Sequence, residues 1–159
     1  MRFSLQMRYA VSGVFDLAYN GHGRAVQVRV IGDRQTIPMR YLEQIFQRLR
    51  KAGLVAGKRG PGGGYTLARL ASEITLRDIL EAVEGPIALF GSGSEGEDSE
   101  EGAELPTDSL GARGPDFIWP ELTQQLSEVL EETTIDDLCR QAARDGIRRA
   151  AIEGYEYQI

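Results

Sequence analysis

Apolar residues recur at helical spacing near the start of the chain. They lie three or four positions apart, as on the buried face of an amphipathic helix. Ser4 precedes the run as a candidate N-cap, and the pair Asn20–Gly21 follows it as a candidate end. The main apolar positions are Ala10, Val11, Val14, Phe15, Leu17 and Ala18. The pattern therefore predicts a first helix that ends near residue 20.

Residues 26–35 are ambiguous. Their β-branched side chains alternate with polar ones, which favours a strand. Their length, and their place before another helical segment, also allow a short helix. On the residues alone, the strand is the preferred interpretation.

A second amphipathic helix is expected after Pro38. Proline suits the first helical turn, because the N–H that it lacks is not needed there. Gly53 provides the end of this helix. One face is apolar, with Tyr41, Leu42, Ile45, Leu49 and Leu54, and the rest is rich in arginine, lysine and glutamine.

Residues 58–65 read Lys-Arg-Gly-Pro-Gly-Gly-Gly-Tyr. This composition predicts a tight exposed turn rather than a packed element, since glycine accepts positive φ and proline fixes its own φ. Residues 54–56 and 65–67 flank it as the strands of a small hairpin. A phosphate-binding P-loop would need Lys and a hydroxyl after the last glycine, and a dinucleotide fingerprint would need glycine where Tyr65 stands. Both nucleotide-binding alternatives fail, and a purely structural hairpin stays open.

The second half of the chain starts with a helix capped at Thr75 and stopped at Gly85–Pro86. Residues 91–104 are almost entirely Gly, Ser, Glu and Asp, which predicts a mobile acidic loop. A long helix is expected after Trp119–Pro120, followed by a short helix capped at Thr134. The apolar stripe of the long helix comprises Ile118, Leu122, Leu126, Val129 and Leu130.

Charge divides the 159-residue chain into two unlike parts. Residues 1–85 hold 13 Lys and Arg against 7 Asp and Glu, a net of +6. Residues 86–159 hold 5 against 17, a net of −12, so the total of −6 hides a basic N-terminal half. A basic half with a charged helix and an exposed turn favours a polyanionic partner, although two well-solvated halves would look the same.

The expected order is helix, short element, helix, hairpin, helix, acidic loop, long helix and short helix. The first four elements match a winged helix-turn-helix, and the fold class expected for the chain is mostly α with a small β-hairpin wing. In that fold the second helix of the pair enters the major groove of DNA, which is about 12 Å wide, and the wing lies along the backbone. The predicted divisions are a DNA-binding domain over 1–85, an acidic loop over 86–116, dimerisation helices over 117–152 and a fraying tail over 153–159.

The sequence resembles the Rrf-type winged-helix transcription regulators, the relatives of the iron–sulfur cluster regulator, the nitric-oxide-sensing repressor and the cysteine-metabolism repressor. The resemblance covers residues 1–85 and, more loosely, 119–143. It rests on short motifs: Arg-Tyr-Ala at 8–10, Tyr-Leu-Glu-Gln at 41–44, Leu-Arg-Lys-Ala-Gly-Leu-Val at 49–55, Arg-Gly-Pro-Gly-Gly-Gly-Tyr at 59–65, Ile-Thr-Leu at 74–76 and Glu-Ala-Val-Glu-Gly at 81–85.

The resemblance implies a bacterial homodimer on palindromic double-stranded DNA, paired through the long helix. It also implies that residues 28–35 form the first helix of the helix-turn-helix, against the strand interpretation. Two departures lie there, Gly32 in the helix and Thr36 where the family turn often has glycine.

The resemblance also implies roles for individual residues. Arg40, Glu43 and Gln44 are expected to reach base edges, unless they form only a solvated helix face. Arg59 is expected to enter the minor groove or grip phosphate, and Arg8 to clamp phosphate. The predicted DNA-binding set is Arg8, Met39, Arg40, Glu43, Gln44, Arg48, Lys58, Arg59, Gly60, Gly62 and Gly63. The predicted dimerisation set is the apolar stripe of the long helix.

No metal or cofactor is expected. Cluster-binding members of the family carry three closely spaced cysteines before the long helix, whereas this chain has one cysteine, Cys139, and one histidine, His22. Cys139 is expected to be a packing residue rather than a redox sensor. The chain is not expected to be an enzyme, because no serine or cysteine nucleophile lies near the single histidine. The single cysteine, with no apolar run of roughly 18 residues and no signal peptide, predicts a cytoplasmic protein without a membrane partner.

Two functional alternatives stay open beside a cluster-free repressor. One is a regulator whose activity depends on a protein co-regulator that docks on the winged domain or the long helix. The other is a cluster-binding member that uses non-cysteine or cross-subunit ligands.

Overall fold

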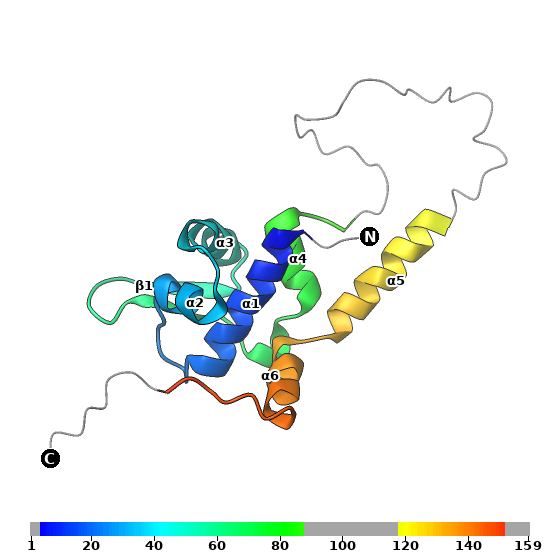
Figure 1. Ribbon diagram of the computed structural model, residues 1–159. Coiled ribbons are helices and arrows are strands. Elements are labelled where there is room, and N and C mark those ends of the chain that lie inside the picture. Colours follow the sequence, from blue (N-terminus) through cyan, green and yellow to red (C-terminus); the bar gives the residue numbers. More distant parts are fainter. Residues whose placement is uncertain (1–3, 88–117, 152–159) are drawn as a thin grey trace, which may run out of the picture.

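The computed structural model describes residues 4–87 and 118–151, and Figure 1 shows their arrangement. The predicted acidic loop over 91–104 and the tail over 153–159 lie outside these residues, so their predicted roles are not tested. In chain order the elements are α1 (Leu5–Asn20), α2 (Val28–Gln35), α3 (Met39–Lys51), β1 (Val55–Lys58), β2 (Gly64–Leu67), the 3₁₀ turn η1 (Ala71–Glu73), α4 (Leu76–Glu84), α5 (Ile118–Glu132) and α6 (Ile135–Arg144).

Helix α1 is the centre of the structure and contacts α2, α3, α4 and α6 (Figure 1). Its start is fixed as expected, because the Ser4 hydroxyl accepts a hydrogen bond from the Met7 N–H at 3.1 Å. Ala10 and Val14 are fully buried on the face that meets the other helices. The helical periodicity of the first twenty residues is thus explained by packing on several sides.

The strand interpretation of residues 26–35 is wrong, and the helix implied by the family resemblance is correct. Residues 28–35 form α2, in which Val28 and Ile31 occupy one buried face. Only Val26 behaves as a strand residue. It pairs with Tyr65 of β2, and the two residues exchange N–H···O hydrogen bonds of 2.9 and 2.8 Å. The alternation of β-branched residues was therefore misleading, because tertiary packing outweighed local propensity.

The turn between α2 and α3 is closed around Gly32 and Thr36. The Ile37 N–H donates to the Gly32 carbonyl at 2.9 Å, and Thr36 has a left-handed backbone with φ of 55°. This is the Schellman arrangement that often ends a helix, with threonine where glycine is usual. A Cβ on Gly32 would lie 2.9 Å from the Ile37 carbonyl oxygen, so the absence of a side chain there allows the close approach.

The predicted hairpin is present as the antiparallel pair β1 and β2. Its register runs from Val55 opposite Leu67 to Lys58 opposite Gly64, and residues 59–63 form the turn. The Tyr65 ring packs on the Phe46 ring of α3 at a centroid distance of 5.0 Å. This contact sets the wing beside the second helix of the helix-turn-helix.

Helices α4 and α6 begin side by side, and both predicted capping sequences form. Thr75 and Thr134 each accept a hydrogen bond from the third following residue, an aspartate that bonds back to the backbone N–H of the threonine. The two caps are joined, since the Leu76 N–H donates to the Thr133 carbonyl and the Ile135 N–H to the Ile74 carbonyl, both at 2.9 Å. The C-terminal helices are thereby attached to the winged unit.

Helix α5 extends away from the winged unit and contacts it through α4 (Figure 1). Arg77 of α4 donates to Glu131 of α5 at 2.8 Å and to Glu81 of its own helix at 2.9 Å. Within residues 4–87 and 118–151, no helix is long and apolar enough to cross a membrane.

Candidate nucleic-acid interface

The polar face of α3 is exposed, as the sequence predicted. Met39 is 47% exposed, and Arg40, Glu43 and Gln44 are also exposed. The opposite face is buried, with Leu42, Ile45, Phe46 and Leu49 in the core. The helix is therefore held from behind, so that its first two turns present cationic, anionic and amide side chains together.

The side chain of Arg40 lies over a neighbouring aromatic ring. Its guanidinium carbon is 4.7 Å from the centre of the Tyr41 ring, and NH2 donates to the Tyr41 hydroxyl at 3.0 Å. Tyr41 in turn contacts Tyr9 of α1, with ring centroids 6.1 Å apart. These contacts orient Arg40 and leave it exposed. Its guanidinium group is therefore accessible to an anion or to the edge of a base.

Arg8 lies on the same side of the helix-turn-helix. It is exposed, and it lines a surface pocket of about 410 Å³ between α1 and the turn that joins α2 to α3. The other residues of this pocket are Leu5, Tyr9, Ser12, Gln35, Thr36 and Ile37. Arg8 thus lies beside the turn that leads into α3, and its contact with phosphate stays a prediction.

The turn of the wing is exposed around its two cations. Lys58, Arg59 and Gly60 are exposed, and Gly60 and Gly62 have φ of 87° and 69°, values that side chains rarely adopt. Gly63 differs from the other turn glycines because it is buried and its N–H donates to the Gly60 carbonyl at 2.8 Å. Because that N–H already closes the turn, it is less available to a ligand than the exposed side chains of Lys58 and Arg59.

Two arginines of α3 are placed differently from the sequence expectation. Arg48, predicted to bind DNA, donates to the Val83 carbonyl at 2.8 Å and to Gln6 at 2.9 Å, so in this structure it joins α3 to α4 and α1. Its contact with DNA stays a prediction. Arg50 was not singled out, yet its side chain lies against Gly57 of β1, between α3 and the wing. Nothing in the basic sequence of residues 48–51 indicated that these two arginines would make different contacts.

A buried carboxylate holds α2 against α1, and no sequence pattern indicated it. Asp16 is 0% exposed. Its Oδ1 accepts from Asn20 at 2.8 Å and from Gln35 at 2.9 Å, and its Oδ2 lies 3.4 Å from Arg34 NH1. The three donors satisfy the buried carboxylate, which would otherwise be costly. The network sets the angle at which the helix-turn-helix presents α3.

This geometry has counterparts in known proteins. The family model Rrf2, described as an iron-dependent transcriptional regulator, matches residues 3–141. The chain belongs to the Rrf2 family.

Individual Rrf2 relatives agree with the family model. The transcriptional regulator IscR of Pectobacterium carotovorum is 37% identical over 139 residues, which span 87% of this chain and 79% of IscR. The solved structure of T. potens IscR has a TM-score of 0.68 at 31% identity, and the match covers 94% of each chain. The structure of CymR, the global cysteine regulator of B. subtilis, has a TM-score of 0.68 at 29% identity and covers 89% of this chain and 98% of CymR. These similarities confirm the family and the winged-helix fold predicted from the sequence.

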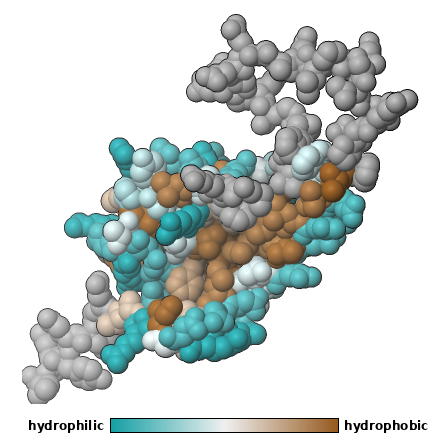
Figure 2. Space-filling model, turned by 45° about the vertical axis from the view of Figure 1, so that its right-hand side comes forward, coloured by the Kyte–Doolittle hydropathy of each residue, from teal (hydrophilic) through white to brown (hydrophobic). Residues whose placement is uncertain are grey.

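Helix α5 carries the apolar stripe that was predicted for dimerisation of this Rrf2 protein. Ile118 is 36% exposed and Val129 is 60% exposed, while Leu122 and Leu126 are half-buried. Leu130 differs, since it is 6% exposed and packs in the hydrophobic core of the chain. Figure 2 shows the apolar surface as a band that runs along α5 and onto the adjoining body of the protein. Exposed bands of this kind mark interaction surfaces.

The cysteine and the histidine of this Rrf2 protein lie in different surroundings. Cys139 is half-buried on α6, where burial raises the pKa of its thiol; the charge of Asp136 raises that pKa further, and Arg149 lowers it. His22 lies in the loop after α1, with Nε2 3.4 Å from the Ala150 carbonyl oxygen. In the described part of the chain, no group of three or more His, Cys, Asp or Glu side chains is placed to hold a metal ion.

Proposed function

We propose that this Rrf2 regulator is a repressor that binds a palindromic operator as a homodimer, without a cysteine-ligated iron–sulfur cluster. The observation that carries the proposal is the exposed polar face of α3 next to an exposed basic wing. Both belong to the N-terminal part of the chain, whose net charge is +6 over residues 1–85. The fold supplies the scaffold, and the exposed side chains supply the chemistry of recognition.

The exposed residues of α3 match the hydrogen-bonding groups of the major groove. Arg40 suits the two acceptors of guanine, and Gln44 suits the acceptor and donor of adenine. Glu43 can accept from the amino group of cytosine, but near phosphate it is repulsive. It therefore favours discrimination between sequences over strength of binding. Arg59 and Lys58 on the wing supply the phosphate or minor-groove contact.

A homodimer is expected to bind a palindromic operator, because the two-fold symmetry of the protein is matched by two-fold symmetry in its DNA site. The apolar face of α5 provides a surface that a second copy can bury, and it carries Ile118, Leu122 and Val129. A protein co-regulator on the same face stays an alternative prediction. The cytoplasmic location also stays a prediction.

The donor set of the chain does not fit a cluster held by cysteines. Iron–sulfur clusters are normally ligated by four thiolates, with imidazole replacing some of them in certain proteins. A single chain, with one cysteine and one histidine, cannot supply that number, so a cluster would need ligands from two chains. Cys139 lies on α6 and His22 in the loop after α1, and among the described residues no group of three or more His, Cys, Asp or Glu side chains is placed to hold a metal ion. The mechanism proposed here includes no step through a cluster.

The proposal is tested by comparing the DNA affinity of Arg59→Ala with that of Arg140→Ala, which removes a positive charge from α6. Arg140 is exposed and pairs only with Asp136 of its own helix among the ion pairs of the described residues. On a fragment from upstream of its own gene, wild-type protein is expected to bind with a Kd that rises steeply with salt. Arg59→Ala should weaken binding by about tenfold or more, and Arg140→Ala by no more than about twofold. Equal affinities for the two variants, or no binding at low salt, would contradict the proposed interface.

A further inference from the structure

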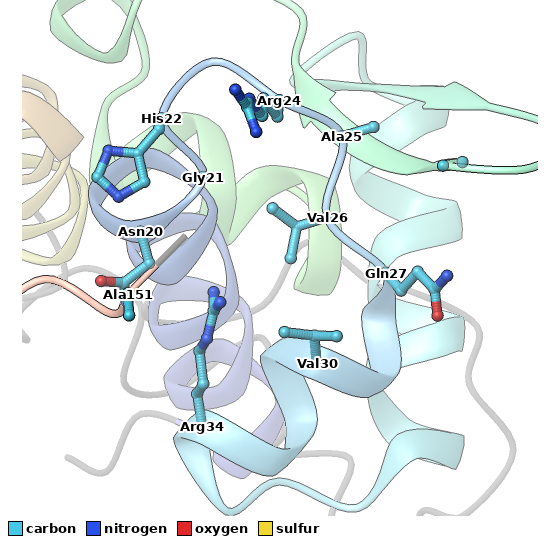
Figure 3. Close-up of a pocket in the computed structure, with 12 residues that line it drawn as sticks. Asn20, Gly21, His22, Arg24, Ala25, Val26, Gln27, Val30, Arg34 and Ala151 are labelled. Carbon is cyan, nitrogen blue, oxygen red and sulfur yellow. The ribbon is translucent and has the colours of Figure 1, made fainter. Parts of the chain in front are cut away.

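A cavity of about 350 Å³ lies between the end of α1, the helix α2 and the turn of the wing (Figure 3). Ala151, in the segment that follows α6, forms part of its wall. The volume is in the range of sites that hold small molecules. None of the residues assigned above to the α3 face contributes to it.

The polar lining of the cavity is cationic. Arg24 and Arg34 contribute guanidinium groups, His22 an imidazole, and Asn20 and Gln27 carboxamides. None of the described lining residues is acidic, although the whole chain has a net charge of −6. Asp16 offsets part of the charge from below, because its Oδ2 lies 3.4 Å from Arg34 NH1. Figure 3 shows the Arg34 side chain rising from α2 into the cavity.

The cavity also has an apolar side. Ala25 and Val26 line it from the loop before α2, and Val30 lines it from α2 itself. A cavity with charged donors on one side and aliphatic side chains on the other selects a ligand that has both characters. Guanidinium groups bind carboxylate and phosphate with paired hydrogen bonds.

From this lining we infer that the cavity binds a small organic anion, with a carboxylate or phosphate group held by Arg34 and Arg24 and an apolar part against Val26 and Val30. The anion is an effector of the operator binding proposed above, and this part of the inference rests on that function.

The cavity adjoins the wing turn on one side and the segment after α6 on the other. Gly62 and Gly63 of the wing turn line it, and a Cβ on Gly63 would lie 2.5 Å from the Lys58 carbonyl oxygen, so this turn is tightly closed. On the other side, the Asn20 side chain accepts a hydrogen bond from the Ala150 N–H at 2.8 Å. An anion bound in the cavity would therefore touch the turn that carries Arg59. A change that the anion makes in DNA affinity would be matched by an equal change that DNA makes in anion affinity.

The test of the cavity is made first without DNA. Benzoate and phenyl phosphate serve as probes, and benzamide serves as the neutral counterpart of benzoate. In titrations followed by amide NMR of the full chain, the two anions should shift signals around Val26, Val30 and Gly62, while benzamide should not. Arg34→Gln should weaken anion binding by about tenfold or more. Arg29→Gln removes an exposed charge from the same helix, outside the cavity, and should leave binding within about twofold.

Arg34 also supports Asp16, so Arg34→Gln can lower stability for a separate reason. Val30→Phe avoids this difficulty, because it fills the cavity from its apolar side and leaves the Asp16 network untouched. It should abolish the anion-induced shifts while the protein stays folded. Equal binding of benzamide and benzoate, or shifts that persist in Val30→Phe, would overturn the inferred site.

The DNA arm separates this inference from the proposed function. Saturating benzoate should change the operator Kd of the wild type by about fivefold or more and leave Val30→Phe unaffected. An unchanged Kd in both proteins would overturn the effector role. If no anion binds and Arg34→Gln weakens DNA binding, the cavity is a contact for DNA phosphate, and the inference fails while the proposed function stands. Anion binding by a protein that never binds DNA would support the cavity and contradict the proposed function.

Discussion

The Gln35 side chain donates a hydrogen bond of 2.9 Å to the fully buried carboxylate of Asp16. The two residues belong to α2 and α1, and Asn20 and Arg34 add their own contacts to the same carboxylate. A buried charge that collects donors from two helices fixes their relative position, because any rotation would leave one group unsatisfied. The orientation of the helix-turn-helix therefore depends on a side chain that never meets the proposed ligand.

Asp16→Ala should destabilise the fold. The substitution leaves the donors of Gln35 and Arg34 without their acceptor, and we expect a loss of about 2–4 kcal/mol in the free energy of unfolding. Asp33→Ala is the matched control, because that carboxylate is 77% exposed and pairs only weakly with Arg29 at 3.9 Å. The control should change stability by at most about 0.5 kcal/mol. Urea unfolding followed by circular dichroism measures both, and similar losses in the two variants would contradict the role given to the network.

Thr36→Gly should stabilise the protein. Threonine holds a left-handed conformation at this position, with φ of 55° and ψ of 43°, which costs about 1–2 kcal/mol for a residue with a Cβ. Glycine removes that strain, although the greater freedom of the unfolded chain offsets part of the gain. We expect a net increase of about 0.5–1 kcal/mol, seen as a higher Tm. Ser12→Gly, within α1, should lower Tm instead, and a fall in Tm for Thr36→Gly would show that the threonine side chain has a stabilising contact.

The contrast between α2 and the other elements shows what could be predicted from the sequence. Caps at Ser4, Thr75 and Thr134 are local signals, and the structure contains all three. Residues 26–35 combine one strand residue, Val26, with a helix, and their alternation cannot show where one ends and the other begins. The boundary depends on the pairing of Val26 with Tyr65, which lies 39 positions away in the sequence.

The candidate site shows the same limit at the level of side chains. The exposed face of α3 and the exposed cations of the wing follow from periodicity and turn chemistry. The burial of Asp16 does not, because its donors Arg34 and Gln35 lie on another helix. Arg48 and Arg50 are alike in sequence, yet one bonds to the Val83 carbonyl and the other lies against Gly57. Such differences arise from tertiary packing.

Val129→Asp should convert the proposed dimer into a monomer. Val129 is 60% exposed on the face of α5 that also holds Ile118 and Leu122, and a carboxylate buried at an apolar interface without a partner is strongly unfavourable. Gln124→Asp places the same charge on the other side of this helix and should leave the dimer intact. Sedimentation velocity at micromolar concentration distinguishes the two outcomes. A monomeric wild type, or equal dissociation of both variants, would contradict dimerisation through this face.

Cys139 should react slowly with iodoacetamide. Burial and the charge of Asp136 raise the pKa of its thiol, so less of the reactive thiolate is present at neutral pH than for an exposed cysteine. Asp136→Asn should move the midpoint of the rate–pH profile to lower pH, and Arg149→Gln should move it to higher pH, since the arginine lowers this pKa. The chain unfolded in urea supplies the reference rate. A native thiol that reacts faster than the unfolded one would indicate an activated cysteine.

The most direct test of the proposed regulator is selection of binding sites from a random duplex DNA library by the purified protein, prepared without added iron. We expect a palindromic motif to be enriched, with a Kd that rises steeply with salt. Glu43→Ala should still select DNA, but with weaker preference at the position that the glutamate reads. Enrichment of no motif by the wild type, or enrichment only after a cluster is supplied, would contradict the account.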